Sequence, residues 1–87
     1  MISAFELKAA VAMKIRLYRH IYRLTQEFVA EQIGINPLTY KGYEHCRSNV
    51  PLIVLVRIAE LYHISLDSLV PRYLLEYADD VMPELHD

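Results

Sequence analysis

Cysteine and glycine are almost absent from this sequence. Its 87 residues contain one Cys, two Gly and four Pro. One Cys cannot form an internal disulfide, which excludes a disulfide-stabilised secreted domain and favours a reducing compartment. So few Gly and Pro residues also exclude low-complexity linkers and long loops. We therefore expect one small domain, of a size that buries about 60% of the surface of its unfolded chain.

Long apolar runs and leader-like segments are missing as well. The most apolar stretch, PLIVLV from Pro51 to Val56, is far shorter than the roughly 20 residues that span a bilayer. The chain does not open with a cationic segment followed by a long apolar core, so no signal peptide is expected. These absences predict a cytoplasmic protein with no membrane partner.

Patterns typical of enzymes and metal sites are also lacking. The sequence has no glycine-rich phosphate loop, and no spacing of Ser, His and Asp singles out a catalytic triad. His20, His45, His63 and Cys46 are scattered at spacings that do not match a zinc site. We therefore expect no enzyme, no catalytic residue, no metal and no cofactor.

The charge of the chain is modest, but its distribution divides the sequence in two. The net charge is −2. Residues 1–70 hold eight Lys and Arg against six Asp and Glu, whereas residues 71–87 hold one Arg against five acidic residues. We expect a mildly basic domain over residues 1–70 and an acidic C-terminal extension over residues 71–87. The hydrophobic content of 54% suggests that some apolar surface is shared with a second chain.

Helical periodicity, in contrast, runs through most of the sequence. Apolar residues recur every three or four positions, and the first series is Phe5, Ala9, Ala12, Ile15 and Tyr22. The predicted helices cover residues 4–22, 26–33, 37–45, 51–62 and 66–70, with a sixth over residues 72–82. Their predicted N-caps are Ser3, Thr25, Asn36 and Ser65. No strand pattern appears, so the predicted fold class is all-α.

Gly34 lies between two of these helices and accounts for their close succession. Glycine tolerates the left-handed conformation that ends a helix, and Asn36 with Pro37 then starts the next one. Ala30, four residues before Gly34, lets the two helices approach closely. Two helices joined by a short turn containing Gly form the unit that lays its second helix into a DNA major groove. The sequence therefore predicts a helix-turn-helix over residues 25–46.

The same residues resemble a known family. LTQEFVAEQIGINPLTYKGYEH and the closing ISLDSLV are similar to the Cro/repressor-type (XRE) helix-turn-helix transcriptional regulators. The resemblance covers residues 15–70, about two-thirds of the chain. It implies a five-helix, lambda-repressor-like DNA-binding bundle, here with an extended first helix and a C-terminal helical tail.

The resemblance also implies roles for individual residues. Gln26 stands where relatives bind a phosphate from a helix N-terminus. Arg19 and Glu44 stand where relatives form a structural ion pair. The residues expected to face or contact DNA are Gln26, Asn36, Pro37, Leu38, Tyr40, Lys41, Gly42, His45, Arg47 and Asn49.

The predicted recognition helix departs from the family pattern at several positions. Relatives often place Gln, Ser, Thr or Arg on its outer face, where amide and guanidinium groups read base edges in two places at once, but Pro37, Leu38 and Gly42 cannot do so. Leu38 is left to contact a thymine methyl, and Lys41 to reach a guanine or a phosphate. A glycine at position 42 destabilises a helix by about 1 kcal/mol relative to alanine. Either a base or a partner approaches closely there, or the glycine arose by neutral drift at an exposed site. Cys46 replaces the usual Gly, so it must accept backbone strain or end the helix differently; a redox role for this thiol stays open.

The sequence also leads to predictions about the dimer interface and about the function of the protein. The candidate dimer interface comprises Leu66, Leu69, Val70, Tyr73, Leu74 and Tyr77. A dimer would present two recognition helices about 34 Å apart, matching palindromic half-sites. The leading hypothesis is a sequence-specific regulator that binds double-stranded DNA as a homodimeric repressor. The alternative is a protein-interaction module or antitoxin that uses the same scaffold to bind a protein partner, with weak or no DNA binding.

Overall fold

The computed structural model describes residues 3–70, which form four α-helices and one 3-10 turn. These elements are α1 (Ala4–Ile21), α2 (Gln26–Ile33), α3 (Pro37–Glu44), α4 (Leu52–Tyr62) and the 3-10 turn η1 (Leu66–Ser68). Within residues 3–70 there is no strand. The sixth predicted helix, together with Tyr73, Leu74 and Tyr77, lies outside the described residues. None of the described helices is long and apolar enough to cross a membrane.

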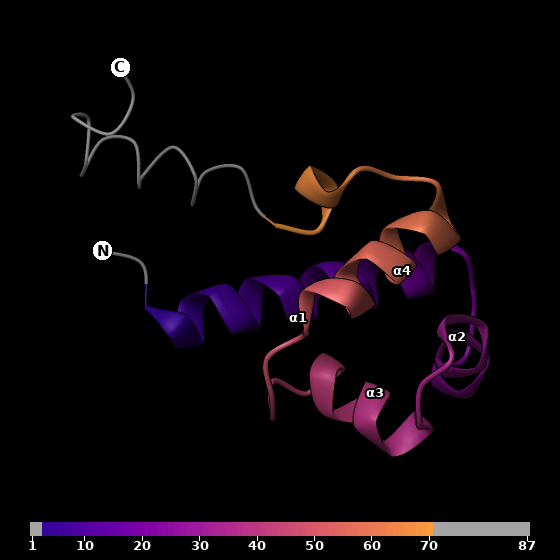
Figure 1. Cartoon of the computed structure of the whole chain (residues 1–87), viewed down its shortest axis with the longest axis horizontal. Coiled ribbons are helices and arrows are strands. Elements are labelled where there is room, and N and C mark those ends of the chain that lie inside the picture. Colours follow the sequence, from indigo (N-terminus) through magenta and orange to yellow (C-terminus); the bar gives the residue numbers. More distant parts are fainter. Residues whose placement is uncertain (1–2, 71–87) are drawn as a thin grey trace.

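The helices surround one apolar core. In Figure 1, α1 runs along the length of the molecule, and α2 and α3 lie toward the C-terminal end of α1. The first turns of α1 extend past the other helices. The core combines residues from all four α-helices with Leu69, which follows the last turn. Its most deeply buried apolar members are Ile15, Val29, Ala30, Tyr40, Ile58 and Leu69.

Three helices begin at the side-chain caps that the sequence predicts. The Glu6 N–H donates to the Ser3 hydroxyl at 3.0 Å, and the Phe28 N–H donates to the Thr25 hydroxyl at 3.0 Å. The Leu38 N–H donates to the Asn36 side-chain oxygen at 2.8 Å. Each cap satisfies a backbone donor that has no partner within its helix. The starts of α1, α2 and α3 are therefore encoded locally.

All four α-helices end in the same left-handed turn. The residue that turns the chain is Arg23, Gly34, Cys46 or His63, with φ of 56°, 73°, 60° and 55° respectively. In each case the next N–H donates to the carbonyl five residues earlier, at 2.8 to 3.0 Å. This is the Schellman arrangement, which favours glycine because a Cβ is strained there. Only one of the four positions is glycine, so three side-chain-bearing residues accept this strain.

The fifth helix expected over residues 66–70 is a single 3-10 turn. Bonds from Ser68 and Leu69 reach three residues back, and the Val70 bond to Leu66 is long, at 3.3 Å. Ser65 does not cap the turn with its side chain. Pro71 follows at once, and proline both lacks an N–H and disfavours a helical residue before it. There is thus no length in which an α-helix could propagate.

This last turn also corrects part of the expected dimer interface. Leu69 has no exposed surface and belongs to the core of its own protomer, so it cannot contact a second chain. Val70 packs partly against the same core. Leu66 remains on the surface. The prediction was wrong for Leu69 because periodicity marks an apolar side chain without telling which surface will cover it.

Candidate nucleic-acid interface

The turn between α2 and α3 places one helix across the other. Gly34 ends α2 in the left-handed conformation, and Asn36 starts α3 two residues later. Ala30 and Ile33 are buried on α2, and Tyr40 and Tyr43 are buried on α3. These side chains hold α3 along its inner side only. Its opposite side is therefore left at the surface.

Most of the exposed side of α3 is formed by residues near its N-terminus. Asn36, Pro37 and Leu38 are exposed, and Leu38 keeps 76% of its surface. The Asn36 side-chain oxygen is used by the N-cap, which leaves its amide N–H groups to contact a ligand. His45 is exposed at the other end of the helix, and Lys41 is half-exposed between them. This side thus offers one amide, one ammonium and one imidazole beside a large apolar side chain.

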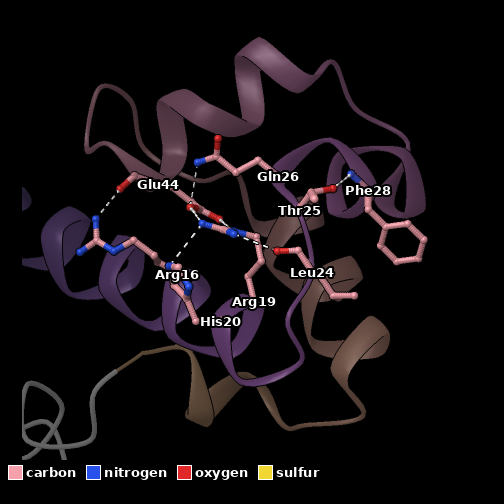
Figure 2. Close-up of polar contacts among 8 residues, drawn as sticks. All are labelled: Arg16, Arg19, His20, Leu24, Thr25, Gln26, Phe28 and Glu44. Carbon is pink, nitrogen blue, oxygen red and sulfur yellow. Dashed lines mark hydrogen bonds and ion pairs between the residues drawn. The ribbon is translucent and has the colours of Figure 1, made fainter.

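A buried charge network fastens the end of α3 to α1. The Arg19 guanidinium donates to both carboxylate oxygens of Glu44, at 2.7 and 2.9 Å, and Glu44 is only 1% exposed. Arg19 also donates to the Leu24 carbonyl at 2.9 Å, and Arg16 donates to the Glu44 carbonyl at 3.2 Å. Figure 2 shows these side chains converging on Glu44. The expected Arg19–Glu44 pair is present and links the predicted recognition helix to the body of the molecule.

The surroundings of Glu44 decide its charge. Burial by itself would raise the pKa of this carboxyl, but hydrogen bonds from Arg19 and Gln26 outweigh that effect and leave the pKa below its usual value. The same pairing raises the pKa of Arg19. Both groups are therefore charged near neutral pH. Removing either partner would leave a charge buried without compensation, which is costly.

Gln26 takes part in this network at the start of α2. Its side-chain nitrogen donates to a Glu44 carboxylate oxygen at 3.0 Å (Figure 2). An amide NH₂ has two hydrogens, so one remains for a phosphate oxygen. Glu44 thus fixes the orientation of Gln26 at a helix N-terminus, where backbone N–H groups and the helix dipole favour anions.

Lys41 and the adjoining loop supply the remaining expected contacts. The Lys41 ammonium lies 3.6 Å from a carboxylate oxygen of Glu27, which follows Gln26 on α2. Arg47 and Asn49 are exposed in the loop after α3. The Arg47 N–H donates to the Gly42 carbonyl at 2.8 Å and closes the end of the helix. Gln26, Lys41 and Arg47 therefore come from three segments that are distinct in sequence.

Comparison with known proteins identifies this arrangement. A family model described as Helix-turn-helix matches residues 15–69. The chain belongs to this helix-turn-helix family. A match over more than half of the chain confirms the family that the LTQE, GI and ISLDSLV segments indicate.

Two relatives of this helix-turn-helix domain are informative. The chain is 39% identical over 72 residues to an uncharacterized HTH-type transcriptional regulator, YobD, of Bacillus subtilis (strain 168). The match covers 83% of this chain but only 60% of the length of that relative. A crystal structure of the hypothetical transcription factor NHTF from Neisseria has a TM-score of 0.71 and 24% sequence identity, with coverage of 88% of this chain and 92% of that one. The structural similarity establishes the shared fold.

Two residues expected at the DNA face of the helix-turn-helix lie elsewhere. Tyr40 has no exposed surface, and its buried hydroxyl has no hydrogen-bond partner within residues 3–70. Burial, reinforced by the nearby Glu44 charge, raises its pKa far above the usual value. Tyr40 is thus a neutral core residue that cannot donate to a phosphate. The prediction failed because a tyrosine ring that anchors a helix this deeply takes its hydroxyl inside as well.

Gly42 also faces inward. It is buried, and a Cβ at this position would lie 3.7 Å from the Ser48 hydroxyl and 3.8 Å from the Arg47 Cβ. These are ordinary contact distances against the protein's own loop. The close approach of a base or a partner at Gly42 is therefore ruled out as the reason for a glycine here. The error came from placing Gly42 on the outer side of α3 without knowing where the following loop would pack.

The structure adds contacts that sequence reasoning missed. Glu27 pairs with Lys41 across two helices, and Arg16 reaches the backbone of Glu44. No helical spacing relates these partners, because they lie on different elements. Within residues 3–70, no group of three or more His, Cys, Asp and Glu side chains is arranged to hold a metal.

Proposed function

We propose that the protein is a transcription regulator that binds double-stranded DNA by inserting α3 into the major groove. The observation that supports this proposal is that α3 is anchored to the rest of the domain along one side only. Its inner side is anchored by Tyr40, Tyr43 and the buried Glu44, while its outer side is exposed among the described residues. A helix held in this way protrudes far enough to enter a groove. No enzymatic role is proposed.

The proposed contacts fall into two groups. Gln26, Arg47 and Asn49 bind phosphates and position the domain, because they flank α3 and carry donors. Leu38, Lys41 and His45 face base edges, with Asn36 and Pro37 at the entry to the groove. Leu38 suits a thymine methyl, whereas Lys41 suits a guanine. One apolar contact and one flexible cation discriminate only weakly between base sequences. Binding as a dimer to a palindromic operator would therefore supply much of the sequence specificity.

We propose that the protein represses transcription by occupying a promoter. A domain of this size that covers a groove blocks other proteins from the same DNA without further machinery. The exposed Leu66, and Tyr73, Leu74 and Tyr77 beyond the described residues, remain candidate dimer contacts.

Binding to duplex DNA at several salt concentrations tests the proposal. Fragments selected from a genomic pool serve as specific DNA, and a scrambled duplex serves as the control. The logarithm of the affinity should fall linearly with the logarithm of salt, with a slope of about 0.9 for each phosphate neutralised. Lys41→Ala should weaken binding to the selected fragments by about tenfold and to the scrambled duplex much less. Arg47→Ala should weaken both about equally, because it contacts backbone.

Two observations favour the protein-interaction alternative. Leu38 is 76% exposed on the outer side of α3, and the acidic Glu27 lies beside Lys41. Both features would suit a protein surface better than a phosphate backbone. If no duplex binds at low salt while Leu38→Ser abolishes binding to a purified partner, the alternative replaces the DNA-binding proposal.

A further inference from the structure

A row of apolar side chains runs along the outside of α1. Phe5, Ala9, Met13, Leu17 and Ile21 follow one another at intervals of four residues, so each lies next to the previous one on the helix surface. Four of them are large and exposed, with 66% of the surface of Phe5, 56% of Met13, 46% of Leu17 and 60% of Ile21 accessible. We call this row the α1 ridge.

The α1 ridge is separate from the core and from the DNA-binding side. Ala10, Val11, Ala12 and Ile15 are the buried residues of the same helix. The two largest, Val11 and Ile15, each lie two positions from Met13, about 200° around the helix at 3.6 residues per turn. Met13 therefore points away from the core. The first turns of α1 also extend past α2, α3 and α4 (Figure 1), so none of these three helices covers them. Four large apolar side chains in line on one helix are more than isolated surface residues need.

The sequence of the α1 ridge is self-complementary about its centre. If a second α1 runs antiparallel with Met13 against Met13, Phe5 faces Ile21 of the other copy. Ala9 then faces Leu17, which places a small side chain opposite a large one. Glu6 faces His20, so that a carboxylate meets an imidazole N–H. Each of these contacts occurs twice by symmetry.

The parallel arrangement is less favourable for the same residues. It would place Glu6 against Glu6 and Arg16 near Arg16, which are like-charge pairs, and it would oppose two alanines at position 9. Antiparallel helices also bring opposite ends of their dipoles together. A crossing angle of about 20°, as in helix bundles, keeps the two helices close on both sides of Met13, from Glu6 to His20.

We propose that the α1 ridge is an interface with a second copy of this chain, formed by two antiparallel α1 helices that cross at Met13. It involves none of the residues proposed to contact DNA, and it differs from the candidate contacts at Leu66 and in residues 71–87. The pairing therefore exists whether or not the protein binds DNA.

Cysteine cross-linking of the full chain tests the register. Cys46→Ser first removes the native thiol, and Met13→Cys is then added. The two introduced thiols lie at the proposed twofold axis, so mild oxidation should convert most of the protein into a covalent dimer. Phe5→Cys in the same background is the matched control. Its two thiols would be separated by about 16 residues of helix rise, roughly 24 Å, and should not cross-link.

Two outcomes of this experiment would overturn the proposal. Cross-linking of the Phe5→Cys variant but not of the Met13→Cys variant would show a different register. Cross-linking of neither variant would show that the α1 ridges do not meet.

Sedimentation of the full chain tests the interface itself. The parent protein should sediment as a dimer and the Leu17→Glu variant as a monomer. The substitution should raise the dissociation constant of the dimer at least a hundredfold and leave the helical circular dichroism spectrum unchanged. Leu52→Glu changes an apolar residue on α4 that is more exposed than Leu17, at 68% against 46%, and should leave the dimer intact. A monomeric parent, or a dimer that Leu17→Glu does not affect but Leu66→Glu dissociates, would contradict the proposal.

Discussion

Cys46 ends α3 in a conformation that glycine adopts most easily. Its φ is 60°, and its N–H donates to the Tyr43 carbonyl at 3.3 Å within the closing turn. A side chain in this region costs about 1 to 2 kcal/mol. The helix ends there because the turn satisfies its last carbonyl groups, and the packed loop that follows outweighs the local strain. Individual residues of this domain are thus held by their surroundings against their own preference.

Replacing Cys46 should therefore stabilise the protein. We expect Cys46→Gly to raise the free energy of unfolding by about 0.5 to 1 kcal/mol, because relief of strain exceeds the added entropy of glycine in the unfolded chain. Urea denaturation measures the change. Cys46→Ala removes the thiol but keeps the Cβ, and it should give no comparable gain; equal gains in the two variants would show that strain is not the cause.

Glu44 should make the stability depend on pH in the acid range. Its pKa is lowered in the folded state from the ordinary value of 4.5. Its contribution to stability is fully present above that value and is lost as the pH falls through the lower folded-state pKa. Glu44→Gln should therefore flatten the acid side of the curve of stability against pH. It should also cost about 3 kcal/mol at neutral pH, because Arg19 loses its buried partner.

Thermal unfolding between pH 2 and 7 measures this effect. Glu60→Gln is the control, since it removes the same charge from an exposed position on α4. If the Glu60→Gln and Glu44→Gln curves have the same shape, the Arg19–Glu44 pair does not govern the acid response.

At the scale of the elements, α2 and α3 are joined by contacts of very different strength. The buried side chains and the Gln26–Glu44 hydrogen bond at 3.0 Å hold the two helices firmly. The Lys41–Glu27 pair is exposed and long, at 3.6 Å, and such pairs contribute at most about 1 kcal/mol. Lys41 can thus leave Glu27 at little cost when a phosphate or base is near.

Removal of the Glu27 charge should strengthen DNA binding. We expect Glu27→Gln to lower the dissociation constant for a selected duplex by about threefold, since it frees Lys41 and removes a negative charge from the surface proposed to contact DNA. Fluorescence anisotropy at a fixed salt concentration measures the change. Glu31→Gln, an exposed carboxylate later on α2, controls for net charge; an equal gain from both would point to charge alone.

At the scale of the whole molecule, the end of the described chain closes the core. Leu69 is completely buried although it follows a single 3-10 turn. Tyr62, at the end of α4, stacks on Tyr18 and Tyr22 at the end of α1, with ring centroids 5.7 and 5.3 Å apart. Burial raises the pKa of Tyr62 to about 12. The C-terminal part of the described domain is therefore bound to its first helix.

Leu69 should be essential to stability while Leu66 is not. Leu69→Ala should cost about 2 to 5 kcal/mol, because it leaves a cavity in the core. Leu66→Ala removes a side chain that is 39% exposed and should cost less than about 1 kcal/mol. Chemical denaturation of the two variants compares them directly. A small effect of Leu69→Ala would show that the core closes without residues after η1.

The proposed α1 pairing belongs to the same scale. It would cover apolar side chains that are exposed in the described domain, residues 3–70, and it fits the high hydrophobic content of the sequence. It would also join two domains through a surface far in sequence from α2 and α3. Because these residues repeat on a helix, sequence alone marks them as apolar, and only the structure shows that they are exposed among residues 3–70.

What the sequence by itself determined is local: the four α-helices of residues 3–70, three of their caps, the turn at Gly34 and the family. Helical spacing, capping hydroxyls and turn residues act over a few positions, so a linear pattern records them. The tertiary structure alone decided which apolar side chains are covered, since that depends on which helices meet. In the folded domain Leu69 and Tyr40 are buried but Phe5 is not, and Gly42 faces a loop. Glu27 lies beside Lys41, because packing joins residues that no short spacing connects.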